Sequence, residues 1–592
     1  MKLVVRKLWK NEIERRCALL LKKNALVESE LPRIFRFLIE KPSDLSIDSL
    51  ICERGNLYTL FERVLVRREL KLCYELSSGK IGRDLFKKNR ILGALLNSDP
   101  FLWDKDLQAF DKLWESYSKE SLSFYLRRAL ASLVICKEPE LYTLHVDYLS
   151  KLLKRLLSML KNFPDEDFEF LCQHLEWFFT GTFNMGTEVN YLEIQTLKAS
   201  LMEVIFDRKF NLGQDKCDLT SFSEDRIIVL RDHLEENSEL NHIRKSIDFL
   251  QAEYDIVYLG FSEIDYVIEI SDTFKGKAYL LPRKELKRSL EFVRTLGAKV
   301  CLYSSPNSGR LFNQSAYLVS KRVASFQVHF LADIVSSGIK EMDFFALGNA
   351  YSEDNLRHEF GENFWKLPGI ACNIPSTVFS GVSSKANDKI MLSSGNLFKL
   401  NTEVLKAWMQ ILKNVDNSSL VLMPFSSTQT RAYELAFRKL LSSVMNEFGV
   451  SRDRVLIQDL QGQEAVMKAI KQARVYLDTY PYSGSTSIFE PLSLGVPIVS
   501  KKGINFRASM GESLLSFLGL GHCVANDEEE YIRKVSDLLD NDINWLEYKR
   551  MQIESLKSFQ GSLRNSLHSE SLDAFKVLFS KNNLNNSDKL DL

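Results

Sequence analysis

A chain of 592 residues is long enough for three or four domains of about 150 residues each. Its composition, 45% hydrophobic and 26% charged, is that of a globular protein with sizeable cores. Because 78 basic residues balance 78 acidic ones, no overall field favours nucleic acid or a membrane surface as a partner.

The nine cysteines are scattered, without a C-x-x-C pair or a Cys/His cluster, which argues against a zinc site and a disulfide framework. The first ten residues are too charged for a secretory signal, and no apolar run reaches 18 residues. The sequence therefore predicts a cytoplasmic protein without a metal site or a transmembrane segment.

Helical periodicity dominates residues 1–220. Apolar side chains recur at steps of three and four residues, for example in Leu122–Ile135 and in Tyr148–Leu160. No 34-residue period is present, so a tetratricopeptide array is not supported. The pattern predicts an irregular all-α domain over residues 1–220.

From residue 225, short apolar strands alternate with amphipathic helices, and the alternation restarts after residue 375. The expected strands are Arg226–Leu230, Asp255–Leu259, Lys299–Tyr303, Met342–Ala346, Lys389–Leu392, Ser419–Met423, Arg454–Ile457, Val475–Leu477 and Pro497–Ser500. Two successive βα sets imply an α/β protein with two doubly wound, Rossmann-like sheets that face each other across a cleft. We expect the domains to cover residues 221–375 and 376–582, the second with closing C-terminal helices, and a polar tail to cover residues 583–592.

The segment from Leu477 to Glu490, LDTYPYSGSTSIFE, predicts a strand, a turn and the start of a helix. After Gly484, the amides and hydroxyls of residues 485–487 would face an anion at the positive end of the helix dipole. Glu490 follows Thr486 by four residues, so it shares that helix face and can accept hydrogen bonds from two sugar hydroxyls. The pattern suits a nucleoside diphosphate sugar; the alternative is a capped β–α turn with an incidental glutamate.

Several motifs together resemble glycosyltransferase family 41, which includes O-GlcNAc transferases, SPINDLY-type fucosyltransferases and bacterial soluble N-glycosyltransferases that modify adhesins. The matching segments follow the family's order from about residue 225 to residue 550: Arg322–Gln327, Ser336–Gly338, Met342–Phe344, Glu362–Pro368, Ser394–Leu420, Leu477–Glu490, Leu494–Val499 and Phe506–Leu520. The resemblance implies a GT-B fold, in which the second Rossmann-like domain binds the nucleotide sugar.

The resemblance also implies roles for single residues. Lys399 matches the family's lysine that neutralises the donor diphosphate, and Asn396 lies at a polar position that contacts the donor. Gly484, Ser485, Thr486 and Ser487 match the phosphate-binding loop, Glu490 the acid that holds the ribose, and Gln327 a glutamine of the first domain's motif that we place with the donor-binding residues. Asp478 belongs to the loop motif, but we interpret it as the residue that orders the turn.

Some positions depart from the family pattern. Ser485 stands where relatives with a Gly-His-Thr-Thr loop have histidine, and Ala465–Met467 contains no aromatic ring to stack on a base. In the first domain, a family histidine aligns with Ser238. His242 matches a second family histidine, and His233 resembles the histidine in the Glu-His-Phe of the bacterial N-glycosyltransferases, so both are candidate catalytic residues. A histidine near a helix start is also often structural, so both interpretations stay open.

These features predict an inverting, metal-independent hexosyltransferase or N-acetylhexosaminyltransferase. It would move a sugar from a nucleotide donor, UDP-GlcNAc or UDP-Glc, to a Ser/Thr or Asn side chain of a polypeptide such as a secreted adhesin or surface protein. The alternatives are a glycan or lipid acceptor, or a GT-B scaffold without activity. We expect the all-α domain to present the acceptor, or to form a cap, a homodimer contact or a partner contact.

Overall fold

The computed structural model describes scattered positions of residues 150–158, residues 190–210, and residues 223–371 and 389–580 with short internal gaps. Contacts divide the chain into one unit of residues 1–182 and 429–439 and a second unit of residues 183–428 and 440–592. Most of the predicted all-α domain lies outside the described residues, as do the polar tail and the first of the two apolar helices named above. The boundaries drawn from the sequence therefore stay predictions.

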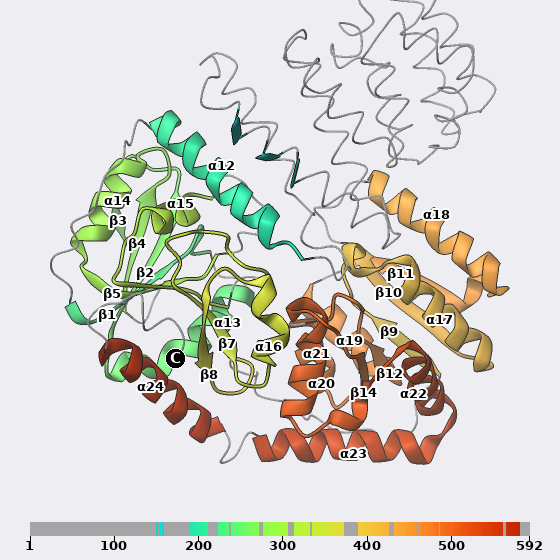
Figure 1. Cartoon of the computed structure of the whole chain (residues 1–592). Coiled ribbons are helices and arrows are strands. Elements are labelled where there is room, and N and C mark those ends of the chain that lie inside the picture. Colours follow the sequence, from blue (N-terminus) through green and yellow to red (C-terminus); the bar gives the residue numbers. More distant parts are fainter. Residues whose placement is uncertain are drawn as a thin grey trace, which may run out of the picture. The chain divides into compact units, whose positions relative to one another are not determined.

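Helix α12 (Leu192–Phe210) comes just before the first sheet, and its apolar residues at helical spacing, such as Ile194, Leu201 and Ile205, are buried. Near its end the Phe206 ring stacks on Tyr317 of α15 with centroids 4.8 Å apart. The Tyr317 hydroxyl donates to Asp207 at 2.6 Å. Helix α12 is thus packed against the first sheet's own helix α15 (Figure 1).

The first sheet has eight strands in the order β3-β4-β2-β1-β5-β6-β7-β8, all parallel except the β3–β4 pair. They are β1 (Ser223–Leu230), β2 (Asp255–Ser262), β3 (Ile268–Glu269), β4 (Lys277–Pro282), β5 (Ala298–Tyr303), β6 (Phe326–His329), β7 (Phe344–Gly348) and β8 (Asn363–Leu367). The helices between them are α13 (Ser238–Ile247), α14 (Leu286–Thr295), α15 (Gln314–Ser320) and α16 (Glu353–Leu356).

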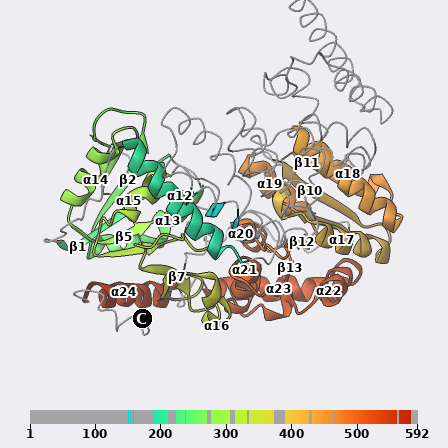
Figure 2. The same cartoon turned by 45° about the horizontal axis from the view of Figure 1, so that its top comes forward.

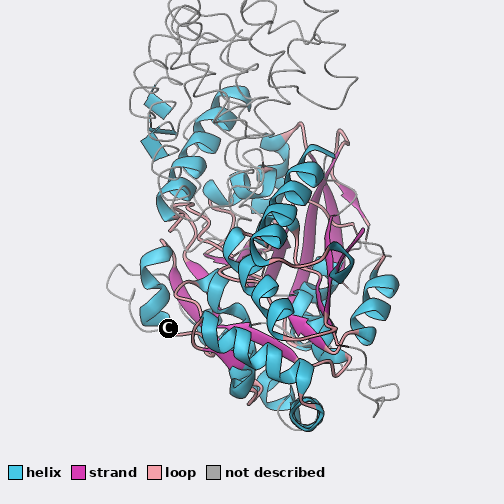
Figure 3. Ribbon diagram, turned by 90° about the vertical axis from the view of Figure 1, so that its right-hand side faces the viewer, coloured by secondary structure: helices cyan, strands magenta, loops and turns pink. Residues whose placement is uncertain are grey.

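The second sheet has six parallel strands in the order β11-β10-β9-β12-β13-β14. They are β9 (Ile390–Ser393), β10 (Ser419–Phe425), β11 (Val455–Asp459), β12 (Val475–Leu477), β13 (Ile498–Lys501) and β14 (Val524–Ala525). Its helices are α17 (Thr402–Asn414), α18 (Arg431–Phe448), α19 (Gln463–Gln472), α20 (Thr486–Ser493), α21 (Phe506–Phe517) and α22 (Glu528–Asp540). Figure 3 shows both sheets flanked by helices, so the predicted α/β class is confirmed.

Each sheet reverses its strand order once. In the first sheet the chain moves from β1 to β2 on one side and later to β5 on the other; in the second sheet the corresponding pair is β9 and β12. Where the order reverses, neighbouring crossovers leave in opposite directions, and a crevice opens beyond the carboxyl ends of the two strands. The loops after β1 and β5, and after β9 and β12, are therefore the places to look for bound ligands.

The C-terminal helices divide between the two sheets. Helix α23 (Asp542–Ser558) follows α22 along the second sheet, whereas α24 (Arg564–Ser580) lies beside the first sheet (Figures 1 and 2). The Phe575 ring packs edge-on against Trp365 of β8, with centroids 4.6 Å apart. Leu578 and Phe579 belong to the same core as β1 and β2. The last described helix thus completes the first sheet's core.

Candidate functional site

The loops that follow β9 and β12 meet at the reversal point of the second sheet. Gly395, just after β9, allows their close approach: a Cβ atom there would lie 2.6 Å from Thr479 Cγ2. Asn401 caps α17 by accepting from Val404 N at 2.9 Å, and its Nδ2 donates to the Tyr480 carbonyl at 3.2 Å. The helix cap therefore also holds the two loops together.

Lys399 ends a short 3-10 turn (Leu397–Lys399) in the first of these loops. Its Nζ donates to the Ser483 carbonyl at 2.9 Å and lies 3.9 Å from the centre of the Tyr482 ring. Burial lowers the pKa of Lys399 to about 8, against the opposing attraction of Asp478. The structure thus brings this predicted residue to the loop that carries Gly484.

Asp478 organises the loop after β12. Its buried carboxylate accepts hydrogen bonds from Thr479 N at 2.9 Å, Gly484 N at 2.7 Å, Ser483 Oγ at 2.5 Å and Ser500 Oγ at 2.6 Å. Burial raises the pKa of Asp478, while these donors oppose the rise because they favour the charged form. The interpretation of Asp478 as the residue that orders the turn is confirmed.

Gly484 leads into α20, where a side chain would not fit. A Cβ atom at Gly484 would lie 2.6 Å from Ser487 Oγ and 2.8 Å from Ile488 Cγ1. The Ser487 hydroxyl interacts with that of Tyr476, which is also 2.8 Å from Ser394 Oγ. Ser485 and the Thr486 side chain lie outside the described residues, so their contact with phosphate stays a prediction.

Glu490 lies in the second turn of α20 and is partly buried, and this burial raises the pKa of its carboxyl group. Among the described residues, no side chain or amide forms a hydrogen bond or ion pair with that carboxylate. Asn396 is exposed in the turn before Lys399, and its carbonyl accepts from the Lys399 amide at 2.8 Å. The Glu490 carboxylate and the Lys399 ammonium group thus lie on either side of the loop after β12.

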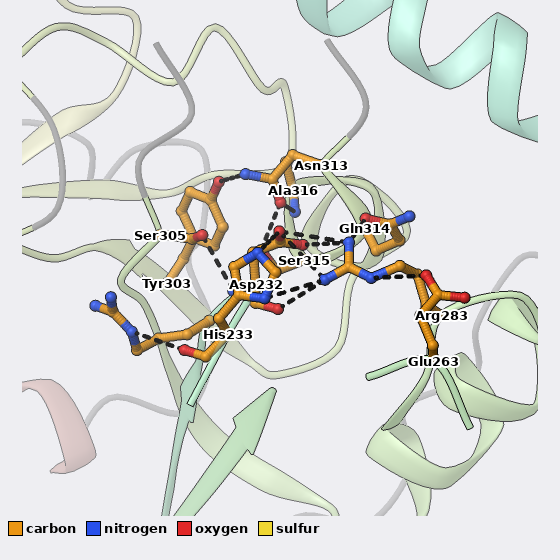
Figure 4. A network of polar contacts seen from close by, with 11 residues as sticks. Asp232, His233, Glu263, Arg283, Tyr303, Ser305, Asn313, Gln314, Ser315 and Ala316 are labelled. Atoms are coloured by element: carbon orange, nitrogen blue, oxygen red, sulfur yellow. Dashed lines mark hydrogen bonds and ion pairs between the residues drawn. The ribbon is translucent and has the colours of Figure 1, made fainter. Parts of the chain in front are cut away.

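A polar network occupies the reversal point of the first sheet (Figure 4). Asp232, after β1, is buried and lies 3.3 Å from Nη1 of Arg283, which follows β4. Arg283 also donates to the Asp232 carbonyl at 3.1 Å and to Gln314 Oε1 at 2.6 Å. Ser305, after β5, accepts from the Asp232 amide at 3.1 Å. The network joins the ends of β1, β4 and β5.

Both ring nitrogens of His233 face this network. Nε2 lies 2.9 Å from Asp232 Oδ2, and Nδ1 lies 3.4 Å from Nη2 of Arg283. Because a guanidinium only donates, Nδ1 is the acceptor in this arrangement and Nε2 is the nitrogen that donates to Asp232. The catalytic role of His233 stays a prediction.

The remaining two predicted residues lie elsewhere. His242 is within α13, and its side chain is outside the described residues. Gln327 is fully buried in β6, where its amide donates to the Val319 and Glu341 carbonyls and accepts from Val323 N at 2.7–2.9 Å. These bonds give Gln327 a structural task in the first sheet, and its assignment to the donor site stays a prediction.

Sequence reasoning did not single out Arg283 or Tyr482. Arg283 follows a strand, β4, that the periodicity did not reveal, so its place at a strand end was hidden. Tyr482 lies inside the recognised loop, but its contact with Lys399 joins residues far apart in the sequence. In the part of the chain that the structure describes, no three His, Cys, Asp or Glu side chains gather as metal ligands would, and no helix is long and apolar enough to cross a membrane.

Residues 383–566 match the family described as Glycosyl transferase family 41. A probable UDP-N-acetylglucosamine--peptide N-acetylglucosaminyltransferase SPINDLY from Eustoma exaltatum subsp. russellianum is 29% identical over 259 residues, which are 42% of this chain and 27% of that protein. A probable enzyme of the same description named SEC, from Arabidopsis thaliana, is 31% identical over 156 residues, 26% of this chain and 15% of its own length. The chain thus spans about a quarter or less of the length of these relatives.

The fold has a solved counterpart in an O-GlcNAc transferase mutant from Thermobaculum terrenum, with a TM-score of 0.55 and 18% identity. The match covers 90% of this chain and 98% of that one. At this identity the likeness concerns the fold. The chain therefore resembles glycosyltransferase family 41 in the sequence of residues 383–566, and its fold is of the GT-B type, with two Rossmann-like sheets.

Proposed function

We propose that the chain is an inverting glycosyltransferase that moves a sugar from a UDP-sugar to a Ser/Thr or Asn side chain of a polypeptide, without a metal ion. The family match over residues 383–566 supports transfer of a sugar. The relatives' names, which specify UDP-N-acetylglucosamine and peptide, favour UDP-GlcNAc over UDP-Glc as the donor and a polypeptide as the acceptor.

The observation that carries the proposal is the position of the Lys399 ammonium group. It lies at the reversal point of the second sheet, where α/β proteins bind nucleotides. An ammonium has three donors, and among the described residues Lys399 uses one of them, on the Ser483 carbonyl, and pairs with no carboxylate at salt-bridge distance. Two donors are therefore open to the oxygens of a diphosphate.

The chemistry follows from that charge. The bond between the sugar's anomeric carbon and the diphosphate oxygen breaks while the acceptor atom forms its bond from the opposite face. Negative charge grows on the leaving diphosphate, where Lys399 and the start of α20 stabilise it. These groups take the place that a divalent cation has in other transferases.

Glu490 fits the nucleoside part of the donor. Its carboxylate, which has no partner among the described residues, can accept from both ribose hydroxyls. On the acceptor side, the proton of the attacking group must pass to a base. We propose His233, which lies beside Asp232, and His242 as the two candidates for this base.

The test is to co-express the full chain with cellular proteins, search them by mass spectrometry for added hexose or N-acetylhexosamine, and measure UDP release by the purified protein. We expect modified peptides with the wild-type chain and none with Lys399→Ala. UDP release without modified protein would point to a glycan or lipid acceptor. No binding or turnover of any nucleotide sugar would mean a GT-B scaffold without activity.

A further inference from the structure

Tyr482 and Lys399 meet at the centre of the proposed donor site, from the two loops that flank the reversal point. The Lys399 Nζ lies 3.9 Å from the centre of the Tyr482 ring, well inside the range of a cation–π contact. The ring is buried, with 8% of the residue's surface exposed. Water is therefore largely kept away from the ring face that the ammonium occupies.

The surroundings leave this ammonium with few compensating groups. Asp478 is the charged group that acts on Lys399, but its two carboxylate oxygens already accept four hydrogen bonds from the loop. The Ser483 carbonyl supplies one neutral acceptor. A partly buried cation with so few partners tends to lose its proton, because burial disfavours the charged form.

We propose that Tyr482 is a positioning residue, whose ring face holds the Lys399 side chain as an ammonium ion and aims it at the donor's diphosphate. This inference rests on the proposed function of Lys399. The ring attracts the cation without forming a salt bridge, so it does not compete with the diphosphate for the ammonium's N–H donors. A carboxylate in the same place would neutralise the charge that the leaving group needs.

A second tyrosine of the same turn, Tyr480, pairs with Lys501 at the end of β13 and serves as a control. Lys501 Nζ lies 4.3 Å from the centre of the Tyr480 ring, but it also pairs with Glu403 at 3.3 Å. That ammonium has a carboxylate of its own and is not beside Gly484. Replacing Tyr480 removes a buried ring from the same turn and leaves the Tyr482 ring face on Lys399.

The experiment measures how readily Lys399 itself reacts with an amine-acylating reagent as a function of pH, by mass spectrometry of the peptide that contains it, in the full-length protein without nucleotide. Wild type should titrate near the pKa of about 8 that burial gives this lysine. In Tyr482→Leu the midpoint should fall by about one pH unit, because the loss of a partly desolvated cation–π contact changes the protonation equilibrium roughly tenfold. Tyr482→Phe keeps the ring and should titrate like wild type, and Tyr480→Leu should leave the midpoint unchanged.

An unchanged midpoint in Tyr482→Leu, or an equal shift in Tyr480→Leu, would overturn the proposal. If the leucine variant does not fold by circular dichroism, Tyr482→Met replaces it. In active protein, the alkaline limb of kcat/KM should move to lower pH with the leucine variant, whereas purely structural damage would lower kcat/KM equally at every pH. Since the labelling needs no turnover, it decides the role of Tyr482 even if the wild-type chain transfers no sugar.

Discussion

At the scale of single residues, the proposed site places a cation where folding alone would not favour one. Lys399 has a pKa of about 8 in the folded chain, below its ordinary value of 10.5, because burial disfavours its charge. The charged side chain therefore costs stability in the free protein. A bound diphosphate would supply the missing counter-charge, so removal of this unfavourable free energy would contribute to the affinity for the donor.

We expect Lys399→Met to lower kcat by about 100-fold or more, because one electrostatic contact to the leaving group is lost. Initial-rate kinetics at saturating donor concentration would measure this loss of kcat. Lys406→Met is the control, since Lys406 pairs with Glu447 on the exposed face of α17. A Lys399→Met enzyme with wild-type turnover would contradict the assignment of Lys399 to catalysis.

The same variant should be more stable than wild type without nucleotide. Because the folded pKa lies below the unfolded one, the destabilisation by the wild-type ammonium is full below pH 8 and disappears as the pH rises through 10.5. The difference in melting temperature between Lys399→Met and the wild type should therefore be largest at pH 7 and shrink towards pH 10.5. Thermal melts of both proteins across this range would show it, and a constant difference would speak against a buried charge.

Glu490→Ala should weaken nucleotide binding by about 1–3 kcal/mol through the loss of charge-assisted hydrogen bonds. Burial raises the pKa of Glu490. On acidification, the affinity of the wild type for nucleotide should therefore begin to fall at a higher pH than it would if Glu490 had the pKa of an ordinary glutamate. Calorimetry with several nucleoside diphosphates at two pH values measures both effects and identifies the base. Glu464→Ala, at the start of α19, is the control, and equal affinity in all three proteins would leave Glu490 a helix residue.

Part of the proposed donor site can be predicted from the sequence. A short apolar strand, a glycine and hydroxyl residues predict the turn from β12 to α20 because they are local features. The contacts of Lys399 with Ser483 and Tyr482 are not local, and no spacing rule predicts them. The same is true of Arg283, which joins Asp232 to Gln314.

At the scale of elements, contacts on two sides hold the backbone at Gly484, in the turn that leads towards α20. Gly484 N is held by Asp478, and the Cα of Gly484 faces Ser487 and Ile488 with no room for a methyl group. These contacts leave the backbone at Gly484 little freedom to take another conformation. Such preorganisation is what an electrostatic catalytic site requires.

We expect Gly484→Ala to destabilise the protein by about 1–3 kcal/mol, as overpacking does, and to reduce nucleotide affinity at the same time. Gly521→Ala is the control, because a Cβ atom at Gly521 meets no atom within 4 Å. Urea unfolding and nucleotide titration of both variants would test the expectation. Full affinity in Gly484→Ala would mean that the turn does not shape the donor site.

The strands show where element prediction succeeds. Strands that contain a run of buried apolar residues, such as β1, β2 and β10, were predicted to within a few residues. β4 and β6 were missed: KAYLLP begins with a lysine and ends with a proline, and FQVH is four residues long with two polar members. Both form because neighbours on each side supply the backbone partners, β2 and β3 for β4, and β5 and β7 for β6.

At the scale of the whole molecule, the position of α12 changes how the helical region should be removed. This helix falls within the predicted all-α region, yet it packs on α15 and belongs to the unit that contains both sheets. Tyr191, just before it, lies under Arg507 of α21 at 4.4 Å. A deletion must therefore stop before α12 if the sheets are to stay intact.

We expect deletion of residues 1–182 to leave nucleotide binding measurable and to abolish transfer to protein, because we propose that this region presents the acceptor. Calorimetry and the mass-spectrometric assay measure the two activities. Solubility is checked first, since residues 429–439 lose the rest of their unit. Full-rate protein glycosylation by the shortened chain would instead favour a cap or a dimer contact for the helical region.

The return of α24 to the first sheet has a consequence for synthesis on the ribosome. Trp365 of β8 is made long before Phe575, which covers it. At about 5–20 residues per second, the roughly 200 residues between them take on the order of 10–40 s to translate. Throughout that delay the nascent first sheet lacks its last helix and keeps an apolar surface open. We expect aggregation of the newly made chain to be most frequent in this interval.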